Sequence, residues 1–187
     1  MSADRAAIYG GSFDPPHMGH VLAVAWALGA GEVDHVWVIP TWKHPFDKEH
    51  GADFEARVEM CKLAFAGLRN AEISTVERDL GGVSRTLSTI EALGTAHPEA
   101  SFRLLIGADI LGETNRWHRW PDVAAAAPPL VVGRAGYPLP DGCPIAIPDV
   151  NSTDIRQGLA QGSKMDGLVP HEVLAYVRAQ GLYRDAP

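Results

Sequence analysis

The feature that most constrains this chain is the segment of residues 8–20, which reads IYGGSFDPPHMGH. An apolar run ends at two glycines, and an apolar-rich stretch follows the second histidine. This order predicts a strand, a turn and a helix, the unit from which parallel sheets are built. Gly10 and Gly11 allow a ligand close to the backbone, and a helix start offers unpaired N–H groups and a positive dipole end. The segment therefore predicts an anion site at a strand end.

Two histidines stand at the start of this predicted helix. If the helix has begun by Met18, His17 and His20 are three residues apart on one face and reach the same phosphate. The alternative is a metal-binding pair or two surface histidines. No cysteine or carboxylate stands at ligand spacing, so a phosphate site is the favoured interpretation.

Short apolar runs alternate with helical patterns along the chain, which is typical of repeated βα units around a mostly parallel sheet. The predicted strands are 6–9, 35–39, 71–76, 103–106, 129–132 and 144–147, and the predicted helices are 18–28, 54–68, 86–96, 122–127, 152–160 and 171–179. Residues 41–53 show no periodic spacing of apolar residues and are expected to form a loop that leaves the end of the second strand. Because ligands bind beyond the carboxyl ends of such strands, we expect this loop and the Gly10 turn to face one crevice.

A second anion-binding pattern lies near the C-terminus, where residues 151–156 read NSTDIR. Ser152 is expected to cap the predicted helix, with Thr153 beside it and Arg156 one turn further on. The alternative is a capped helix whose arginine is solvated. Together with the first segment, this one predicts two phosphate clamps that hold a polyphosphate at both ends, with the reaction between them.

Composition limits the function classes. The 187 residues are expected to form one domain, 1–187, and the net charge of -7 argues against general nucleic-acid binding, so small molecules are the expected partners. Two cysteines, Cys61 and Cys143, are too few for a disulfide framework and are expected to be reduced thiols. No apolar run approaches the roughly 20 residues of a membrane span, and no leader pattern is present, so a cytoplasmic location away from membranes is expected. A monomer and a homo-oligomer both remain open.

These segments carry a family resemblance. The runs GGSFDPPHMGH at 10–20 and STDIR at 152–156, in that order and separation, resemble those of the bacterial nicotinate-nucleotide adenylyltransferases of the His-x-Gly-His nucleotidyltransferase superfamily. Residues 57–60, 107–109, 168–170 and 181–183 extend the likeness over nearly the whole chain. The resemblance implies a Rossmann-like, doubly wound α/β fold with a mostly parallel sheet and helices on both faces.

The resemblance also implies a reaction and its residues. The phosphate of nicotinate mononucleotide attacks the α-phosphorus of ATP, giving deamido-NAD and pyrophosphate, with Mg²⁺ bound through substrate phosphates rather than by a dedicated metal site. His17 and His20 are the expected catalytic donors, and either would be protonated near neutral pH when facing phosphates. The implied ATP-binding residues are Gly10, Gly11, Ser12, Phe13, Gly107, Asp109, Ser152, Thr153 and Arg156. The implied acceptor-nucleotide residues are Asp14, Lys48, Thr86 and Trp117.

Several of these roles have competing interpretations. Asp109 would bind ribose hydroxyls or cap a helix, and Thr86 would lie near the pyridine carboxylate or act only as a cap. Trp120 competes with Trp117 for stacking on the pyridine ring. Arg85 replaces a tyrosine usual in the family and would pair with a substrate anion or be solvated, and only Lys48 carries over from a usual Pro-Pro-His-Lys run.

Three functional hypotheses follow. The first is adenylyl transfer to nicotinate mononucleotide, with nicotinamide mononucleotide as an alternate acceptor. The second is a sister enzyme acting on phosphopantetheine, which has no ring to stack on Trp117. The third is a non-catalytic nucleotide-binding protein, against which both histidines and the Ser-Thr-x-x-Arg set argue.

Overall fold

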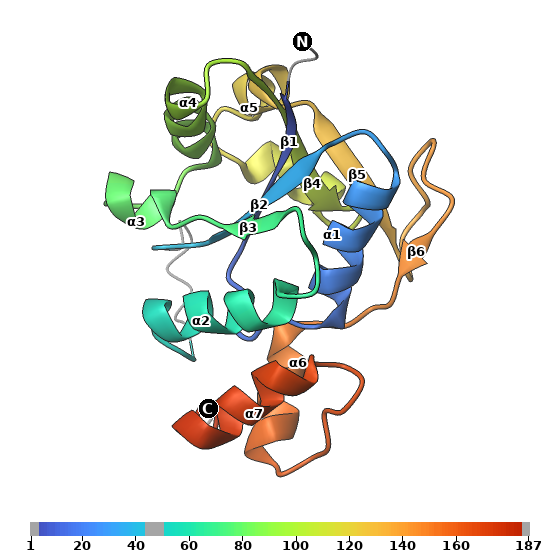
Figure 1. The fold of residues 1–187 in the computed structure, drawn as a ribbon. Helices are drawn as coiled ribbons and strands as arrows, with labels where there is room; N and C mark the ends of the chain where they lie inside the picture. The colour runs from blue at the N-terminus through green and yellow to red at the C-terminus, as the bar shows by residue number, and fades with distance from the viewer. Residues whose placement is uncertain (1–3, 44–50, 185–187) are drawn as a thin grey trace.

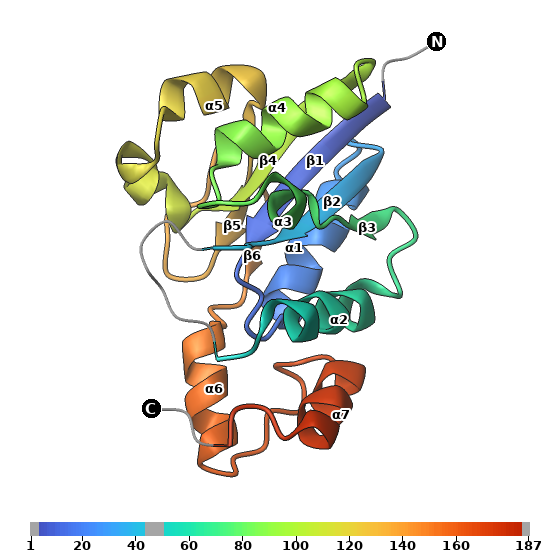
Figure 2. The same cartoon turned by 90° about the vertical axis from the view of Figure 1, so that its left-hand side faces the viewer.

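The fold is a parallel sheet between layers of helices (Figures 1 and 2). A computed structural model describes residues 4–43 and 51–184, and in that part six strands pair in parallel in the order β3-β2-β1-β4-β5-β6. The strands are β1 (Asp4–Gly11), β2 (His35–Pro40), β3 (Ala71–Ile73), β4 (Ala100–Gly107), β5 (Pro129–Arg134) and β6 (Ala146–Ile147). The predicted doubly wound α/β fold is confirmed. The order reverses between β1 and β4, where such sheets bind ligands.

Helices cover both faces because alternate strand residues point to opposite sides. The described helices are α1 (Met18–Gly29), α2 (Phe54–Phe65), α3 (Val76–Leu80), α4 (Thr86–Ala96), α5 (Trp120–Ala126), α6 (Ser152–Ala160) and α7 (His171–Gln180), with a 3₁₀ helix, η1 (Ile110–Arg116). Ala7 and Leu105 pack with α1, α2 and α7 in one core. Ile8 and Leu104 pack with α4 and α5 in the other. Both faces of the sheet are therefore buried, as the apolar strands require.

The C-terminal helices α6 and α7 form an extra layer beyond α2 and the start of α1 (Figure 1). Val173, Leu174 and Val177 of α7 are buried in the same core cluster as Met60 and Cys61 of α2. This packing brings the last described residues of the chain beside the turn that follows β1. Chain segments far apart in sequence thus meet at the predicted phosphate site.

The structure corrects some predicted boundaries. The strand predicted at 71–76 ends at Ile73, because the chain turns at Ser74 and Val76 begins α3. The helix predicted to reach residue 68 ends at Phe65, and the strand predicted at 144–147 is reduced to Ala146–Ile147. Sequence reasoning did not predict η1. This helix has no buried residues, so its sequence shows no periodic spacing of apolar residues from which a helix could be predicted.

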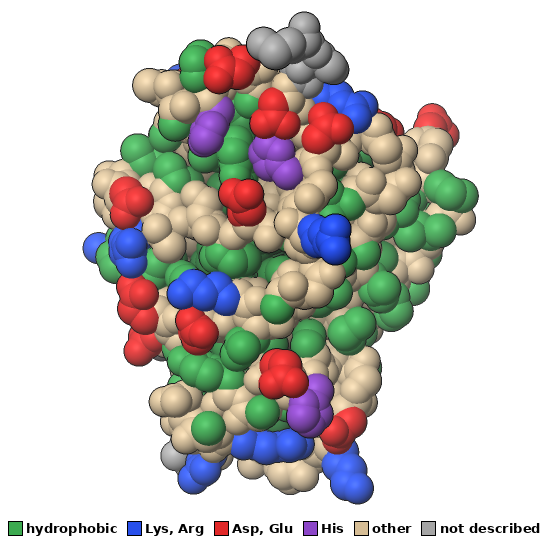
Figure 3. Space-filling view, viewed as in Figure 1, with side chains coloured by type: hydrophobic (Ala, Val, Ile, Leu, Met, Phe, Trp, Pro, Cys, Tyr) green, Lys and Arg blue, Asp and Glu red, His purple; other side chains and the backbone are tan. Residues whose placement is uncertain are grey.

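The outer surface shows where apolar side chains remain uncovered. Figure 3 shows hydrophobic side chains on the right-hand side, over the loop between β5 and β6, and Tyr137, Leu139 and Ile145 of that loop are exposed. Cys61 and Cys143 are buried free thiols. Within residues 4–43 and 51–184, no helix is both long and apolar enough to cross a membrane.

Candidate active site

The two histidines of the first segment lie face to face at the start of α1. His17 is the residue before the helix, and its ring stacks on that of His20 with centroids 3.7 Å apart and an interplanar angle of 25°. The backbone N–H of His17 donates to Nδ1 of His20 over 3.1 Å, which leaves the His20 proton on Nε2 as a donor. A Cβ at Gly19 would come within 3.1 Å of the His17 ring, so glycine lets the ring pack there. The structure thus brings both predicted catalytic residues together.

Both imidazoles are neutral at pH 7 without a ligand. Burial, with the nearby Arg134 cation, lowers the pKa of His17 to about 4. Burial, the adjacent His17 and Arg134 also hold the pKa of His20 well below its usual value. The expected protonation near neutral pH therefore requires the negative charge of bound phosphates to offset burial.

This burial predicts an acid-sensitive fold. A histidine has a pKa near 6.5 in the unfolded chain, and His17 has one of about 4 when folded, so the unfolded state binds more protons between these values. We expect the free energy of unfolding to fall as pH drops from about 6.5 to 4. Denaturant unfolding at several pH values measures it, with His17→Gln expected to show a shallower dependence. The same slope in His17→Gln and the unsubstituted protein would contradict this origin.

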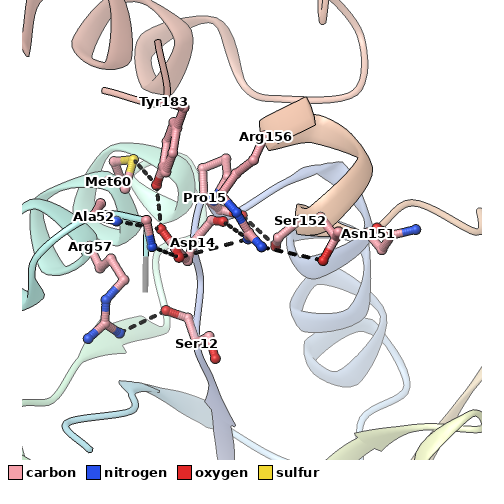
Figure 4. A network of polar contacts seen from close by, with 12 residues as sticks. Ser12, Asp14, Pro15, Ala52, Arg57, Met60, Asn151, Ser152, Arg156 and Tyr183 are labelled. Atoms are coloured by element: carbon pink, nitrogen blue, oxygen red, sulfur yellow. Dashed lines mark hydrogen bonds and ion pairs between the residues drawn. The ribbon is translucent and has the colours of Figure 1, made fainter. Parts of the chain in front are cut away.

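The turn between β1 and α1 is held by side chains from other elements (Figure 4). Arg57 of α2 donates to the Ser12 carbonyl over 2.9 Å, Arg156 to that of Asp14 over 2.7 Å, and Ser152 to that of Pro15 over 2.9 Å. Arg57 is fully buried, and burial lowers the pKa of its guanidinium. The carbonyls of the turn are therefore fixed before any ligand binds, which is preorganisation of an anion site.

Asp14 occupies the centre of this region rather than an open surface. Its carboxylate is buried and accepts from the backbone N–H groups of Gly51 and Ala52 and from the hydroxyl of Tyr183. Its assignment to the acceptor nucleotide stays a prediction. In the structure its carboxylate joins the loop that enters α2 to the C-terminal layer.

The start of α6 lies against the same turn. Asn151 caps this helix by accepting from the N–H of Asp154 over 2.9 Å, so the prediction that Ser152 is the cap is wrong. Asparagine and serine are both good caps. Here Asn151, one residue before Ser152, has the extended backbone that a cap needs. Arg156 is not solvated, because it contacts Asp14, and its other nitrogen lies 3.4 Å from the Thr153 hydroxyl. The predicted second clamp therefore adjoins the first.

The carboxyl ends of β4 and β5 carry a further charged pair. Asp109 accepts from Nη1 of Arg134 over 2.8 Å, and Arg134 also binds Asp149 over 2.9 Å. Asp109 makes no capping bond to η1, which does not support the capping interpretation. A Cβ at Gly107 would collide with the Asp109 carboxylate, so glycine is needed there. Sequence reasoning missed Arg134, although its position at the carboxyl end of a strand was a usable signal.

The predicted acceptor residues lie partly on α4 and η1. Thr86 is the first residue of α4 and makes no capping bond, while Arg85 before it is exposed. Ser84 accepts from the backbone N–H groups of Trp42 and Lys43, which places the start of α4 beside the exit of β2. Lys48 lies outside the described residues.

The two candidate stacking residues contact each other. Trp117 and Trp120 have ring centroids 5.6 Å apart in an edge-to-face arrangement, and both pack half-buried against the core of α4 and α5. Trp117 directly follows η1, while Trp120 is the first residue of α5. A stacking role for Trp117 stays a prediction.

Fold and site together define a class of protein. The histidines follow β1, beside the point where the strand order reverses and doubly wound sheets bind nucleotides. Arg134 ends β5, and Arg156 of α6 contacts the turn after β1. Two helix starts and two guanidinium groups suit phosphates. This is the arrangement of a nucleotide-binding α/β protein that handles a polyphosphate.

Comparisons with known proteins specify the family. Residues 8–158 match the family model described as cytidylyltransferase-like. The chain is 47% identical over 188 residues to a protein of Anaeromyxobacter sp. (strain K) named probable nicotinate-nucleotide adenylyltransferase, covering 98% of this chain and 100% of that protein. A protein of the same name from Myxococcus xanthus is 37% identical, with 97% and 95% covered. The chain belongs to the cytidylyltransferase-like family and, within it, to the nicotinate-nucleotide adenylyltransferases.

Solved structures support the fold independently. The nicotinic acid mononucleotide adenylyltransferase of Plasmodium falciparum, complexed with NaAD, superposes with a TM-score of 0.81 at 16% identity, covering 97% of this chain and 98% of that one. A putative nicotinate-nucleotide adenylyltransferase from Vibrio parahaemolyticus gives 0.77 at 22% identity, with 98% and 97% covered. The Rossmann-like fold implied by the sequence is confirmed.

Proposed function

We propose that this protein transfers the adenylyl group of ATP to nicotinate mononucleotide, giving deamido-NAD and pyrophosphate in NAD biosynthesis. The observation that carries the proposal is the stacked pair His17 and His20 on a turn fixed by Arg57, Ser152 and Arg156. The full-length likeness to proteins named nicotinate-nucleotide adenylyltransferases supports the acceptor.

The geometry supports a direct in-line transfer. A phosphate oxygen of the acceptor bonds to the α-phosphorus of ATP while the bond from that phosphorus to the bridging oxygen of the β-phosphate breaks, and pyrophosphate leaves with that electron pair. Nε2–H of His20 and the ring of His17 stabilise charge on the α-phosphate, and Arg156 with Thr153 binds the departing phosphates. The protein contributes position and charge, so no covalent intermediate is needed.

Magnesium is expected to enter with ATP. Within the described residues there is no group of three or more histidine, cysteine or acidic side chains that would hold a metal ion. An Mg²⁺ ion that enters with ATP would keep most of its waters and bind substrate phosphates, where it would neutralise charge on the leaving group. One buried carboxylate oxygen of Asp109 has no hydrogen-bond partner in the described part of the chain, which supports the proposal that Asp109 binds the ribose of ATP.

The acceptor can be identified by pyrophosphate release. Purified protein with ATP and Mg²⁺ should turn over nicotinate mononucleotide much faster than nicotinamide mononucleotide or phosphopantetheine. Stacking on an aromatic ring is worth about 1–3 kcal/mol, so Trp117→Ala should raise the KM for nicotinate mononucleotide about tenfold and leave that for ATP unchanged. Trp120→Ala is the matched control, since it removes the neighbouring ring.

The outcomes separate the hypotheses. Preference for another acceptor would reject the proposed substrate and keep the transfer chemistry. ATP binding without turnover of any acceptor would reject the enzyme itself. A larger effect of Trp120→Ala than of Trp117→Ala would move the stacking role to Trp120.

A further inference from the structure

Tyr183 is a buried C-terminal residue that the reaction above does not use. It follows α7 after Gly181, is 6% exposed, and donates its hydroxyl proton to Oδ1 of Asp14 over 2.6 Å. Burial and the Asp14 carboxylate raise the pKa of this phenol, so it stays protonated and remains a donor at every working pH. The bond joins residues 169 positions apart in the chain.

Asp14 connects Tyr183 to the phosphate side of the site (Figure 4). Its carboxylate accepts from the N–H of Gly51 over 2.6 Å and from that of Ala52 over 3.1 Å. Its backbone carbonyl accepts from Nη1 of Arg156 over 2.7 Å, and the same nitrogen lies 3.8 Å from its Oδ2. Asp14 therefore holds Nη1 of Arg156 through both its carbonyl and its carboxylate, and the Tyr183 hydroxyl bonds that carboxylate in turn.

Backbone strain is concentrated at this contact. Phe13 has a φ of 48° and Tyr183 a φ of 60°, both in the left-handed region that side chains other than glycine rarely adopt. Within the described residues the only other non-glycine residue with positive φ is Arg119. A residue stays in such an unfavourable backbone conformation only where the surrounding contacts hold it there, and residues of this kind are often found at functional sites.

We propose that Tyr183 is a positioning residue for the ATP side of adenylyl transfer, which holds Asp14 and, through it, the guanidinium of Arg156. The inference rests on the proposed function and adds a role for the C-terminal layer in it. Tyr183 touches no reacting atom. It acts by fixing the orientation from which Arg156 meets the phosphates.

The decisive variant is Tyr183→Phe, which keeps the ring and removes only the hydroxyl. Because Arg156 would lose part of its support, we expect the KM for ATP to rise about five- to tenfold and kcat to fall by a similar factor. The KM for the acceptor nucleotide should stay within about twofold of its original value. Tyr176→Phe on α7 is the matched control, since the Tyr176 hydroxyl makes no hydrogen bond in the described part of the chain, and its kinetics should not change.

A comparison of single and double variants tests whether Tyr183 acts through Arg156. If Tyr183 acts through Arg156, then Tyr183→Phe should cost little further activity in an Arg156→Ala background. Additive losses would overturn the proposed route. Unchanged kinetics of Tyr183→Phe, with only a lower melting temperature, would overturn the positioning role altogether.

A binding measurement separates this inference from the proposed function. Calorimetric titration with a non-hydrolysable ATP analogue, without any acceptor, should show weaker binding to Tyr183→Phe than to Tyr176→Phe. The ligand-induced rise in melting temperature gives the same comparison if the variant is unstable. Equal binding by the two variants would overturn the inference even if the acceptor proved to be a different molecule. Weaker binding with no turnover of nicotinate mononucleotide by the unsubstituted protein would reject only the proposed function.

Discussion

Replacing His20 with alanine will lower kcat by about 100- to 1000-fold, the effect of deleting one preorganised donor at a transition-state oxygen. The variant loses the Nε2–H donor and the acceptor for the His17 N–H at the same time. ATP binding should weaken only a few-fold, because the turn remains held by Arg57, Ser152 and Arg156. Steady-state kinetics together with titration of ATP in the absence of acceptor measure the two quantities separately.

Two further variants show whether the loss is chemical. His20→Asn keeps a side-chain oxygen that accepts the His17 N–H at the helix start, but its amide is too short to replace the imidazole donor. It should therefore melt close to the unsubstituted protein and remain slow. His171→Ala removes an exposed histidine at the start of α7 and should leave kcat unchanged. A kcat within about threefold of the original in His20→Ala would remove His20 from the proposed mechanism.

Replacing Arg134 with alanine is expected to give the second large effect, a loss of about 100-fold or more in kcat/KM together with lower stability. Its side chain is 18% exposed and that of Asp109 is 20% exposed, so the pair is largely removed from solvent. Removing one partner of a fully buried ion pair lowers the free energy of unfolding by about 3–5 kcal/mol. Because the Arg134–Asp109 ion pair is partly exposed, we expect a decrease of about 1–3 kcal/mol here. Asp109 and Asp149 would both lose their cation.

The same variant tests the electrostatics of the histidines. The Arg134 cation helps to lower the pKa values of both His17 and His20, so removing it lets both rise towards 6.5. The interval in which the unfolded state binds more protons becomes narrower, and stability should depend less steeply on pH between about 6.5 and 4. Arg134→Lys keeps the positive charge and should retain the steep dependence of stability on pH. It loses the planar guanidinium, whose several N–H groups bind Asp109 and Asp149 together.

A surface pair provides the matched control for Arg134. Arg5 and Asp34 form a close pair with side chains 44% and 48% exposed, at the other end of the sheet. Exposed pairs contribute about 0–1 kcal/mol, so Arg5→Ala should change stability slightly and catalysis not at all. Similar losses of activity in Arg5→Ala and Arg134→Ala would show that general destabilisation, rather than the site, explains the second prediction.

The local features of the fold could be predicted from sequence because each depends on residues that are close together in the chain. The helix at 86–96 and the start of α1 at Met18 were placed correctly from apolar spacing and from the glycine turn. The short α3 and η1 were not, since neither buries a residue and so neither carries a period. The family was confirmed by the comparisons, while the roles of individual residues in binding and catalysis stay predictions.

By itself the sequence determined the alternation that makes a doubly wound sheet, the glycine turn after β1, and the close placement of His17 and His20 at the start of α1. Each depends on residues within a few positions of one another, where spacing and backbone geometry decide the outcome. Only the tertiary structure decided that Arg134 pairs with Asp109, that Tyr183 holds Asp14 and that Ser152 bonds the Pro15 carbonyl. The partners are 25, 169 and 137 residues apart. Such contacts, and the burial that keeps both histidines neutral, arise only when packing brings distant segments together and excludes water between them.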